Sequence, residues 1–346
     1  MKVTTSSFIS SQLTKQQIKA LLLGDNDQWL FQEADRICRK VFDNQVYLRG
    51  IVEFSNYCRQ HCHYCGLRSN NRNLERYRLT EKQILAAVDN VLETGLKTIV
   101  LQSGDDSKYS MFSISRLIDA IKQRDDVAVT LSLGERRYDE YQQWRQDGAD
   151  RYLLKMETFN RQKFNELRPK SDFDKRLEHL SYLKELGYQV GSGIIVGLPG
   201  ITIDSLVNDL IALTALELDM IACGPFVAHS DTPLCSNNNG QVLLSHRVTA
   251  ILRLMNPLAH IPATSSLEVL DKGARTRAIT RGCNIVMPSF TPTEVFTNYT
   301  IYPGKNASTL TIEQRLEAIS QQIQSQGLNP TISRGDSKRK SHVSRY

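Results

Sequence analysis

The chain has 346 residues, of which 40% are hydrophobic and 23% are charged, as is usual for a globular protein. It has no apolar run of about 18 residues or more, and its N-terminus lacks the apolar core and cleavage site of a signal peptide, so we expect a cytoplasmic protein without a membrane span. The net charge of +6 suits a small anionic ligand or an acidic partner. Aromatic and basic residues are not interleaved as they are in RNA-binding segments, so we expect no nucleic-acid binding.

Two helices are predicted first, over residues 13–24 and 27–43, because apolar residues recur there at helical spacing. Apolar strands and amphipathic helices then alternate. The strands are predicted over 48–54, 98–102, 128–133, 151–156, 191–196, 220–227, 261–265 and 284–288. The helices between them are predicted near 80–95, 114–124, 138–147, 173–187, 202–216, 241–255 and 269–281.

This alternation predicts an α/β fold with a parallel sheet, since parallel strands need helical crossovers and are almost continuously apolar when buried. Eight strand–helix units favour a (β/α)8 TIM-type barrel. A doubly wound sheet is the alternative, because periodicity cannot show closure. We predict one domain over 1–346, with N-terminal helices at 1–45, a barrel core at 46–292 and a C-terminal helical extension at 293–346.

The C-terminal extension is predicted to contain a helix over 310–324, followed by the basic tail SRGDSKRKSHVSRY. Lysine and arginine near a chain end could bind an acidic partner. A solvated and frayed terminus is the more usual outcome, and we expect it here.

Three of the seven cysteines stand close together in EFSNYCRQHCHYCGLRSNN, where Cys58, Cys62 and Cys65 have the spacing C-x3-C-x2-C. Thiolates are the usual protein ligands of iron–sulfur cubanes, and such short spacing lets one loop wrap a cluster. Three thiolates leave one of four irons open, as in a reactive rather than a structural metal centre. The segment therefore predicts a [4Fe–4S] cluster.

Three other interpretations fit this segment less well. A zinc ion could use His61 or His63 as the fourth ligand, but no second C-x2-C pair completes such a site. Buried structural thiols would fit poorly in so polar a loop, and a redox disulfide would leave one of the three cysteines over. We expect Cys223, Cys235 and Cys283 to be free thiols.

The motif C-x3-C-x-aromatic-C after the first barrel strand, with Tyr64 as the aromatic residue, resembles the signature of the radical S-adenosylmethionine (SAM) family. The resemblance implies that SAM binds the open iron and that an electron cleaves it to methionine and a 5′-deoxyadenosyl radical. It also implies an electron donor such as ferredoxin or flavodoxin. The barrel would orient the reactants and exclude water.

From about Leu48 to Lys305 the chain further resembles the HydE group, the radical SAM maturases of [FeFe]-hydrogenase. The resembling stretches include IVEFSNYCRQHCHYCGLR, KTIVLQSGDD, VTLSLGE, GADRYLLKMET, LRP, GSGIIVGLPG, IPAT and YPGK. The resemblance implies a small anionic iron–CO–CN–cysteine precursor as the substrate during H-cluster assembly. Other hydrogenase maturation proteins would be partners. No cysteine follows Cys283, so we predict no accessory cluster.

A biosynthetic radical SAM enzyme is the alternative function. Biotin synthase needs interior cysteines for a second cluster, and the predicted second, third and fifth strands contain none. Methylornithine synthase needs no second cluster, but it should present carboxylates to the amino group of its substrate. Only Glu157 and Asp105 suggest themselves for that role.

The resemblance also assigns individual site residues. Those implied to contact SAM are Tyr64, Gln102, Ser103, Gly104, Ser132, Glu157 and Arg176. Those implied to contact the substrate are Arg49, Arg151, Lys155, Thr264, Ser265 and Tyr302. Arginine suits a carboxylate because it donates two parallel hydrogen bonds, but Glu157 and Arg176 could equally form an ion pair within the fold.

Two positions depart from the family pattern. Lys155 stands where the compared members have arginine, which keeps the charge but loses the planar guanidinium fork. Met156 replaces an expected histidine. Apart from the resemblance, Arg49 and Arg151 would be interpreted as rim or surface residues.

Overall fold

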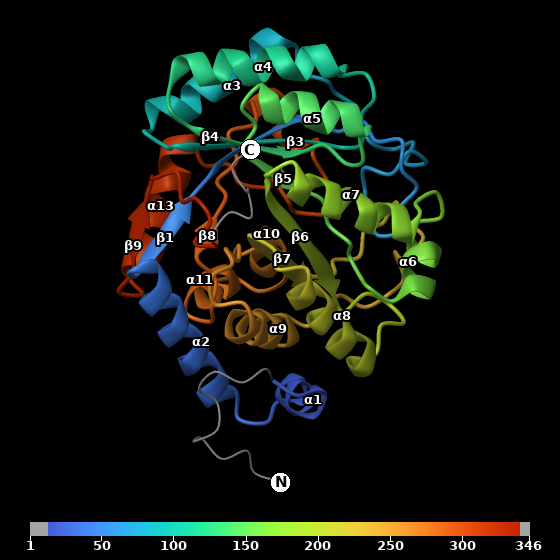
Figure 1. Ribbon diagram of the computed structural model, residues 1–346, viewed down its shortest axis with the longest axis vertical. Coiled ribbons are helices and arrows are strands. Elements are labelled where there is room, and N and C mark those ends of the chain that lie inside the picture. The colour runs from blue at the N-terminus through green and yellow to red at the C-terminus, as the bar shows by residue number, and fades with distance from the viewer. Residues whose placement is uncertain (1–12, 340–346) are drawn as a thin grey trace.

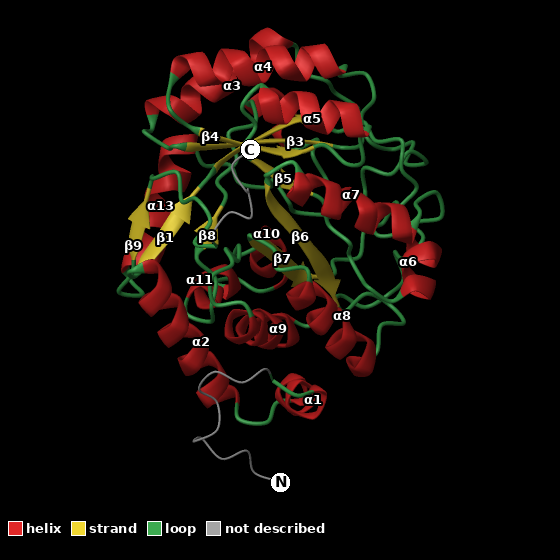
Figure 2. Ribbon diagram, in the orientation of Figure 1, coloured by secondary structure: helices red, strands yellow, loops and turns green. Residues whose placement is uncertain are grey.

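The computed structural model describes residues 13–339, which form a barrel of parallel strands surrounded by helices (Figure 1 and Figure 2). Two helices come first, α1 (Lys15–Leu23) and α2 (Asp27–Phe42). The Thr14 hydroxyl accepts from the backbone of Gln17, and the Asn26 side chain caps α2 in the same way, so each helix begins at a polar cap. Both predicted N-terminal helices are confirmed.

A six-stranded parallel sheet makes most of the barrel, in the order β2-β3-β4-β5-β6-β7. Its strands are β2 (Gly50–Ser55), β3 (Thr98–Ser103), β4 (Ala128–Ser132), β5 (Arg151–Leu153), β6 (Gln189–Val196) and β7 (Met220–Pro225). The helices between them are α3 (Glu81–Glu93), α4 (Met111–Arg124), α5 (Tyr138–Gln146), α6 (Arg161–Leu167), α7 (Phe173–Glu185) and α8 (Ile203–Ala215). Every residue of β2 and β7 is buried, as expected for strands covered on both faces.

The remaining part of the barrel is less regular. It contains β1 (Gln45–Leu48), α9 (Val242–Met255), α10 (Ser265–Leu270), α11 (Ala274–Ile279), β8 (Ile285–Val286), α12 (Thr293–Phe296), α13 (Ile312–Gln324) and β9 (Asn329–Thr331). The strands among them form a second parallel sheet in the order β8-β1-β9. Isolated parallel bridges link Met220 to His260, Pro262 to Ile285, and Ile51 to Ser289. These bridges continue the six-stranded sheet from β7 back to β2, so the (β/α)8 TIM-type architecture is confirmed.

Several predicted elements differ in detail. The strand expected over 261–265 is reduced to single bridges, and the expected strand 48–54 is divided into β1 and β2 at Arg49. The helix expected over 269–281 is wrong, because the chain breaks into α10 and α11 at Gly273, whose φ of 81° is left-handed. The division of the chain as a single domain stays a prediction.

The C-terminal residues 332–339, here called the strap, cross the end of the barrel at which the strands begin. Arg151 donates to the carbonyls of Arg334 and Gly335 and to the carboxylate of Asp336, while Arg49 donates to the Gly335 carbonyl at 3.1 Å. The prediction of a frayed tail is therefore wrong for these residues, since buried donors at the barrel end bind their carbonyls. The rest of the tail, 340–346, lies outside the described residues.

No helix within residues 13–339 combines the length and the apolar character that crossing a bilayer would require.

Candidate active site

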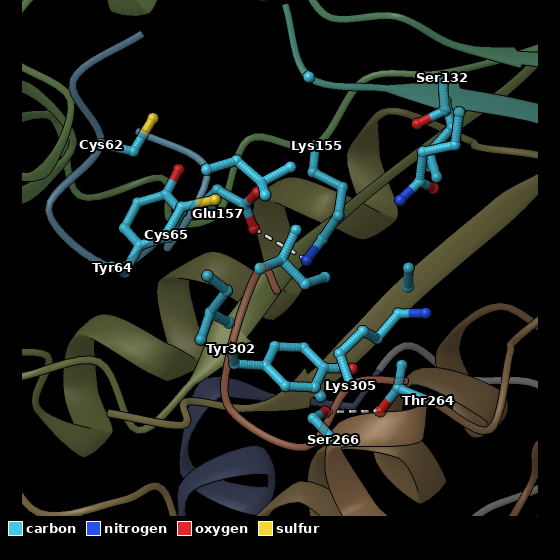
Figure 3. A pocket seen from close by; sticks show the side chains of 18 of the residues that line it. Cys62, Tyr64, Cys65, Ser132, Lys155, Glu157, Thr264, Ser266, Tyr302 and Lys305 are labelled. Atoms are coloured by element: carbon cyan, nitrogen blue, oxygen red, sulfur yellow. Dashed lines mark hydrogen bonds and ion pairs between the residues drawn. The ribbon is translucent and has the colours of Figure 1, made fainter. Parts of the chain in front are cut away.

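A cavity of about 380 Å³ opens where the barrel strands end, and the predicted cysteine loop forms part of its wall. In Figure 3, Cys62, Cys65 and Tyr64 lie on one side of the cavity, Ser132 and Lys155 on another, and Tyr302, Thr264 and Ser266 on a third. Active sites of TIM-type barrels lie at this end of the strands. The loops after the strands therefore bring together residues that are far apart in the sequence.

The three cysteines of the loop after β2 all line this cavity as free thiols. The backbone N–H of Asp105 donates to Cys58 Sγ at 3.4 Å, an interaction that would stabilise a thiolate. Burial, helped by the nearby Cys62, raises the pKa of the Cys58 thiol to about 11, and burial raises that of Cys65 further. Without positive charge from a metal these sulfurs therefore stay protonated at neutral pH.

Two glycines let the cysteine loop approach its neighbours closely. A Cβ on Gly104 would lie 2.1 Å from the Tyr57 carbonyl oxygen and 2.8 Å from Cys58 Cβ. A Cβ on Gly66 would lie 2.2 Å from the Thr300 carbonyl oxygen. The three thiols on one cavity wall are the soft sulfur donors that would hold an iron–sulfur cluster.

The zinc interpretation gains no ligand from the histidines of the loop, since His61 and His63 do not line the cavity. Within the described residues, no three His, Cys, Asp or Glu side chains, the three cysteines of the loop included, converge as a site for a single metal ion.

The side chains predicted to contact SAM lie together beside the cysteines. All seven of them line the cavity: Tyr64, Gln102, Ser103, Gly104, Ser132, Glu157 and Arg176. The parallel register pairs Gln102 on β3 with Ser132 on β4, which places both at the ends of their strands. Their contact with SAM itself stays a prediction.

Glu157 has a left-handed backbone, with φ of 71°, which is uncommon for a residue with a Cβ and often marks a functional position. Backbone hydrogen bonds with Gly193 and Ile195, at 2.9 and 3.0 Å, hold it there. Its carboxylate lies 2.9 Å from Lys155 Nζ, as the dashed line in Figure 3 shows. The sequence left open a Glu157–Arg176 pair, and the structure instead pairs Glu157 with Lys155.

Arg176 and Arg168 bring two buried cations to the same wall. Arg176 forms an ion pair with Glu135 and donates from Nε to the Lys155 carbonyl at 2.8 Å. Burial alone would raise the pKa of Glu135, but Arg176, aided by Arg168, holds it below its ordinary value. Arg168 donates to the Tyr64 hydroxyl at 2.7 Å and thereby fixes the aromatic residue of the cysteine motif.

The opposite wall is made of hydroxyl groups and buried cations. Tyr302 and Ser265 share a hydrogen bond of 2.6 Å between their oxygens, and Thr264 and Ser266 share one of 3.1 Å. Lys305 lies beside them and forms an ion pair of 2.7 Å with Glu53. Of the predicted substrate contacts, Lys155, Thr264, Ser265 and Tyr302 thus line the cavity, and their role stays a prediction.

Arg49 and Arg151 do not line the cavity, so the structure does not bring these two predicted substrate contacts to the site. Arg49 directly precedes β2 and Arg151 begins β5, which places both at the barrel end opposite the cysteines. There they bind the strap, and Arg49 is separated from the cavity by Met220, whose sulfur it contacts at 3.5 Å. Met156, the other departure from the family pattern, is fully buried and also lies outside the cavity lining.

Four charged residues of the cavity were missed as site residues: Glu135, Arg168, Arg275 and Lys305. Three of them fall within stretches that already resembled the family, namely VTLSLGE, LRP and YPGK. Arg275 falls in none of the stretches that resemble the family. Only the tertiary structure brings it to the site.

The comparisons with known proteins agree with this arrangement. Residues 52–211 match the family model of the Radical SAM superfamily. The chain is 44% identical over 297 residues to the [FeFe] hydrogenase maturase subunit HydE of Thermotoga maritima, across 85% of each chain. It is 28% identical to the 3-methylornithine synthase of Methanosarcina acetivorans, across 83% of each chain.

The fold is also similar to that of a solved structure. The crystal structure of methylornithine synthase (PylB) aligns with a TM-score of 0.83 at 25% identity, over 93% of this chain and 95% of that one. Radical SAM enzymes use a [4Fe–4S] cluster and SAM, which are therefore the cofactors of this chain. The chain belongs to the radical SAM superfamily of enzymes, as a homologue of the [FeFe]-hydrogenase maturase HydE.

Proposed function

We propose that this enzyme is a maturase of [FeFe]-hydrogenase that acts on an anionic iron–CO–CN–cysteine precursor during assembly of the H-cluster. The observation that carries the proposal is the 44% identity to HydE across 85% of both chains. The cavity is consistent with an anionic substrate, because five cationic side chains line it against three carboxylates. Other hydrogenase maturation proteins and a ferredoxin or flavodoxin in the cytoplasm would be the partners.

The protein would act chiefly by positioning and by exclusion of solvent. We propose Cys58, Cys62 and Cys65 as the cluster ligands. Bound there, the cluster supplies the electron that cleaves SAM. Arg176 would donate to the SAM carboxylate and Glu157 would accept from its ribose hydroxyl or amino group.

The hydroxyl wall opposite the cysteines would hold the substrate. Thr264, Ser265 and Tyr302 can donate to or accept from polar ligands of an iron complex, and the apolar side chains of Leu153, Met220 and other residues exclude water. Lys155 would add positive charge, although its ion pair with Glu157 shares that charge with the SAM site.

Methylornithine synthesis is the second candidate function, favoured only by the 28% identity and by the likeness of the fold. An enzyme of that kind should offer free carboxylates to an amino group. Here Asp105 is bound to Arg59 at 2.9 Å, Glu157 to Lys155, and Glu135 to Arg176. The carboxylates of the cavity are therefore already paired with cations.

Deletion of the gene in a host that makes [FeFe]-hydrogenase tests the proposal. We expect hydrogenase activity to be lost, to return with the wild-type gene, and to stay absent with Cys62→Ser. Cys235→Ser is the matched control, because this thiol is exposed and lies outside the cavity, and it should restore activity. Normal hydrogenase activity in the deletion strain would refute the proposal.

A test in vitro separates the chemistry of SAM from the identity of the substrate. After anaerobic reconstitution and reduction, the wild type should convert SAM to methionine and 5′-deoxyadenosine. Cys62→Ser should do neither and should bind less iron. Cleavage of SAM without rescue of hydrogenase activity would point to the biosynthetic alternative.

A further inference from the structure

The five cations that line the cavity differ in whether another side chain of the described residues accepts a hydrogen bond from them. Four donate to a side chain of the described residues: Lys155 to Glu157, Arg168 to Tyr64, Arg176 to Glu135 and Lys305 to Glu53. The fifth is Arg275 on α11, and its guanidinium has no hydrogen bond or ion pair with any residue of the described part of the chain. Among the residues that the structure describes around this cavity, Arg275 is thus the cation whose guanidinium has no side-chain partner at all, whereas Arg168 still donates to a neutral hydroxyl.

The nearest acid does not neutralise Arg275. Glu268 accepts from the backbone N–H groups of Gly273 and Arg275, at 3.0 and 3.3 Å, so its carboxylate closes the turn between α10 and α11. Burial lowers the pKa of Arg275, and Glu268 raises it only in part. Arginine still remains protonated, so a positive charge with five unused donors faces the cavity.

A partly buried charge without a partner is costly, and an anion that pairs with it removes that cost. Arg275 lies within electrostatic reach of Tyr302 and Lys305, on the wall that also holds the Ser265 and Thr264 hydroxyls. A guanidinium binds a carboxylate through two parallel hydrogen bonds, an arrangement that an ammonium group cannot reproduce.

We propose that Arg275 binds the carboxylate of the amino-acid part of the substrate, an inference that rests on the proposed function. The neighbouring hydroxyls of Tyr302 and Ser265 complete the polar surroundings of that carboxylate. Lys155 is less suited to this task, because Glu157 already holds its ammonium group at 2.9 Å and because lysine lacks the planar fork. Recognition of the carboxylate in this chain therefore falls to α11.

Binding of two small probes tests the inference. L-Cysteine has the carboxylate and cysteamine lacks it, while both have the thiol and the amine. Dissociation constants are measured by calorimetry on the anaerobically reconstituted enzyme, with saturating SAM and no reductant, so that no turnover occurs. For the wild type we expect L-cysteine to bind at least about tenfold more tightly than cysteamine.

Substitutions on α11 assign the effect to one side chain. Arg275→Met should weaken L-cysteine binding by about 10- to 100-fold and leave cysteamine unchanged, because a charged hydrogen-bonded contact is lost. Arg275→Lys keeps the charge and should give an intermediate loss. Arg277→Met is the matched control, since Arg277 stands two residues further on the same helix and pairs with Asp271 outside the cavity, and it should bind both probes as the wild type does.

Three outcomes would overturn the inference: no preference of the wild type for L-cysteine, wild-type binding by Arg275→Met, or an equal loss with Arg277→Met. If Arg275→Met does not fold, Arg275→Lys decides the question through the same ratio of the two probes. If the deletion strain keeps normal hydrogenase activity while L-cysteine binding depends on Arg275, the proposed function is refuted. Recognition of a carboxylate by Arg275 is then still supported.

Discussion

Lys305 shows how a cation of the cavity wall can be structural. Its partner Glu53 is completely buried and also accepts from the hydroxyls of Ser289, at 2.5 Å, and Thr291. Burial alone would raise the pKa of Glu53, but Lys305 and these two hydroxyls hold it below its ordinary value. The carboxylate is therefore ionised, and Lys305 is committed to it rather than to a ligand.

Lys305→Met should destabilise the protein by about 3 kcal/mol, because it leaves a buried carboxylate without its counter-ion. The double variant Glu53→Gln, Lys305→Met removes both charges and should recover most of that loss. Urea unfolding of the cluster-free protein at pH 7 measures both free energies. Equal stability of the wild type and Lys305→Met would show that the pair contributes nothing.

The site could be predicted from the sequence only where the residues stand close together or follow a strand. The spacing of Cys58, Cys62 and Cys65 predicted their common loop, and the resemblance supplied the SAM set. Arg275 was missed because no local pattern marks it. Arg151 begins β5 and therefore lies at the barrel end away from the active site, a signal against a substrate contact that the sequence already contained.

At the scale of the element, α8 fixes the turn that follows Glu157. Asp209 of α8 is buried and accepts from the Phe159 backbone N–H at 2.7 Å and from the Thr158 hydroxyl. Burial raises the pKa of Asp209 to about 6, and these hydrogen bonds offset only part of the effect. The turn is therefore held by a carboxyl group whose burial favours its protonated form.

The raised pKa of Asp209 predicts a pH dependence of stability. The folded state keeps its proton up to a pH of about 6, whereas the unfolded chain loses it near 4, so the free energy of unfolding should fall between these values as pH rises. Asp209→Asn should remove this decrease and gain up to about 3 kcal/mol above pH 6 relative to the wild type. Urea unfolding from pH 4 to 8 measures the free energy of unfolding of each variant. Asp204→Asn, at an exposed position of the same helix, is the control. A parallel pH profile for wild type and Asp209→Asn would contradict the assignment.

The elements with strong periodicity were predicted well, and those that depend on the whole barrel were not. The strands β3, β4, β6 and β7 lie within a few residues of their predictions, because each is a continuous apolar run. The strand predicted over 284–288 is present as the short β8, whereas β9 was not predicted and forms by pairing with the distant β1. Such long-range pairing leaves no local pattern to predict it.

At the scale of the whole molecule, the strap joins the end of the chain to the start of the barrel strands. The Thr98 hydroxyl donates to the Arg334 carbonyl at 2.8 Å, Gln189 donates to Asp336 at 3.0 Å, and the Ser337 hydroxyl donates to Asp219. These contacts span β3, the start of β6 and the residue before β7. The strap therefore closes the barrel end opposite the cysteines. There Arg49 donates to the strap and contacts Met220, which lines the cavity.

Arg151→Met distinguishes this structural role from the substrate contact that the family resemblance implied. The substitution removes three hydrogen bonds to the strap, so amide hydrogen exchange over 332–339 should become much faster, while β3 and β6 keep their protection. Cleavage of SAM by the reconstituted enzyme should stay close to the wild-type rate, because Arg151 lies outside the cavity. Lys338→Ala, an exposed change within the strap itself, should leave both measurements unchanged. If the strap stays protected in Arg151→Met while hydrogenase maturation fails, Arg151 acts as a substrate contact. The floor of the cavity must then open for the substrate to reach Arg151.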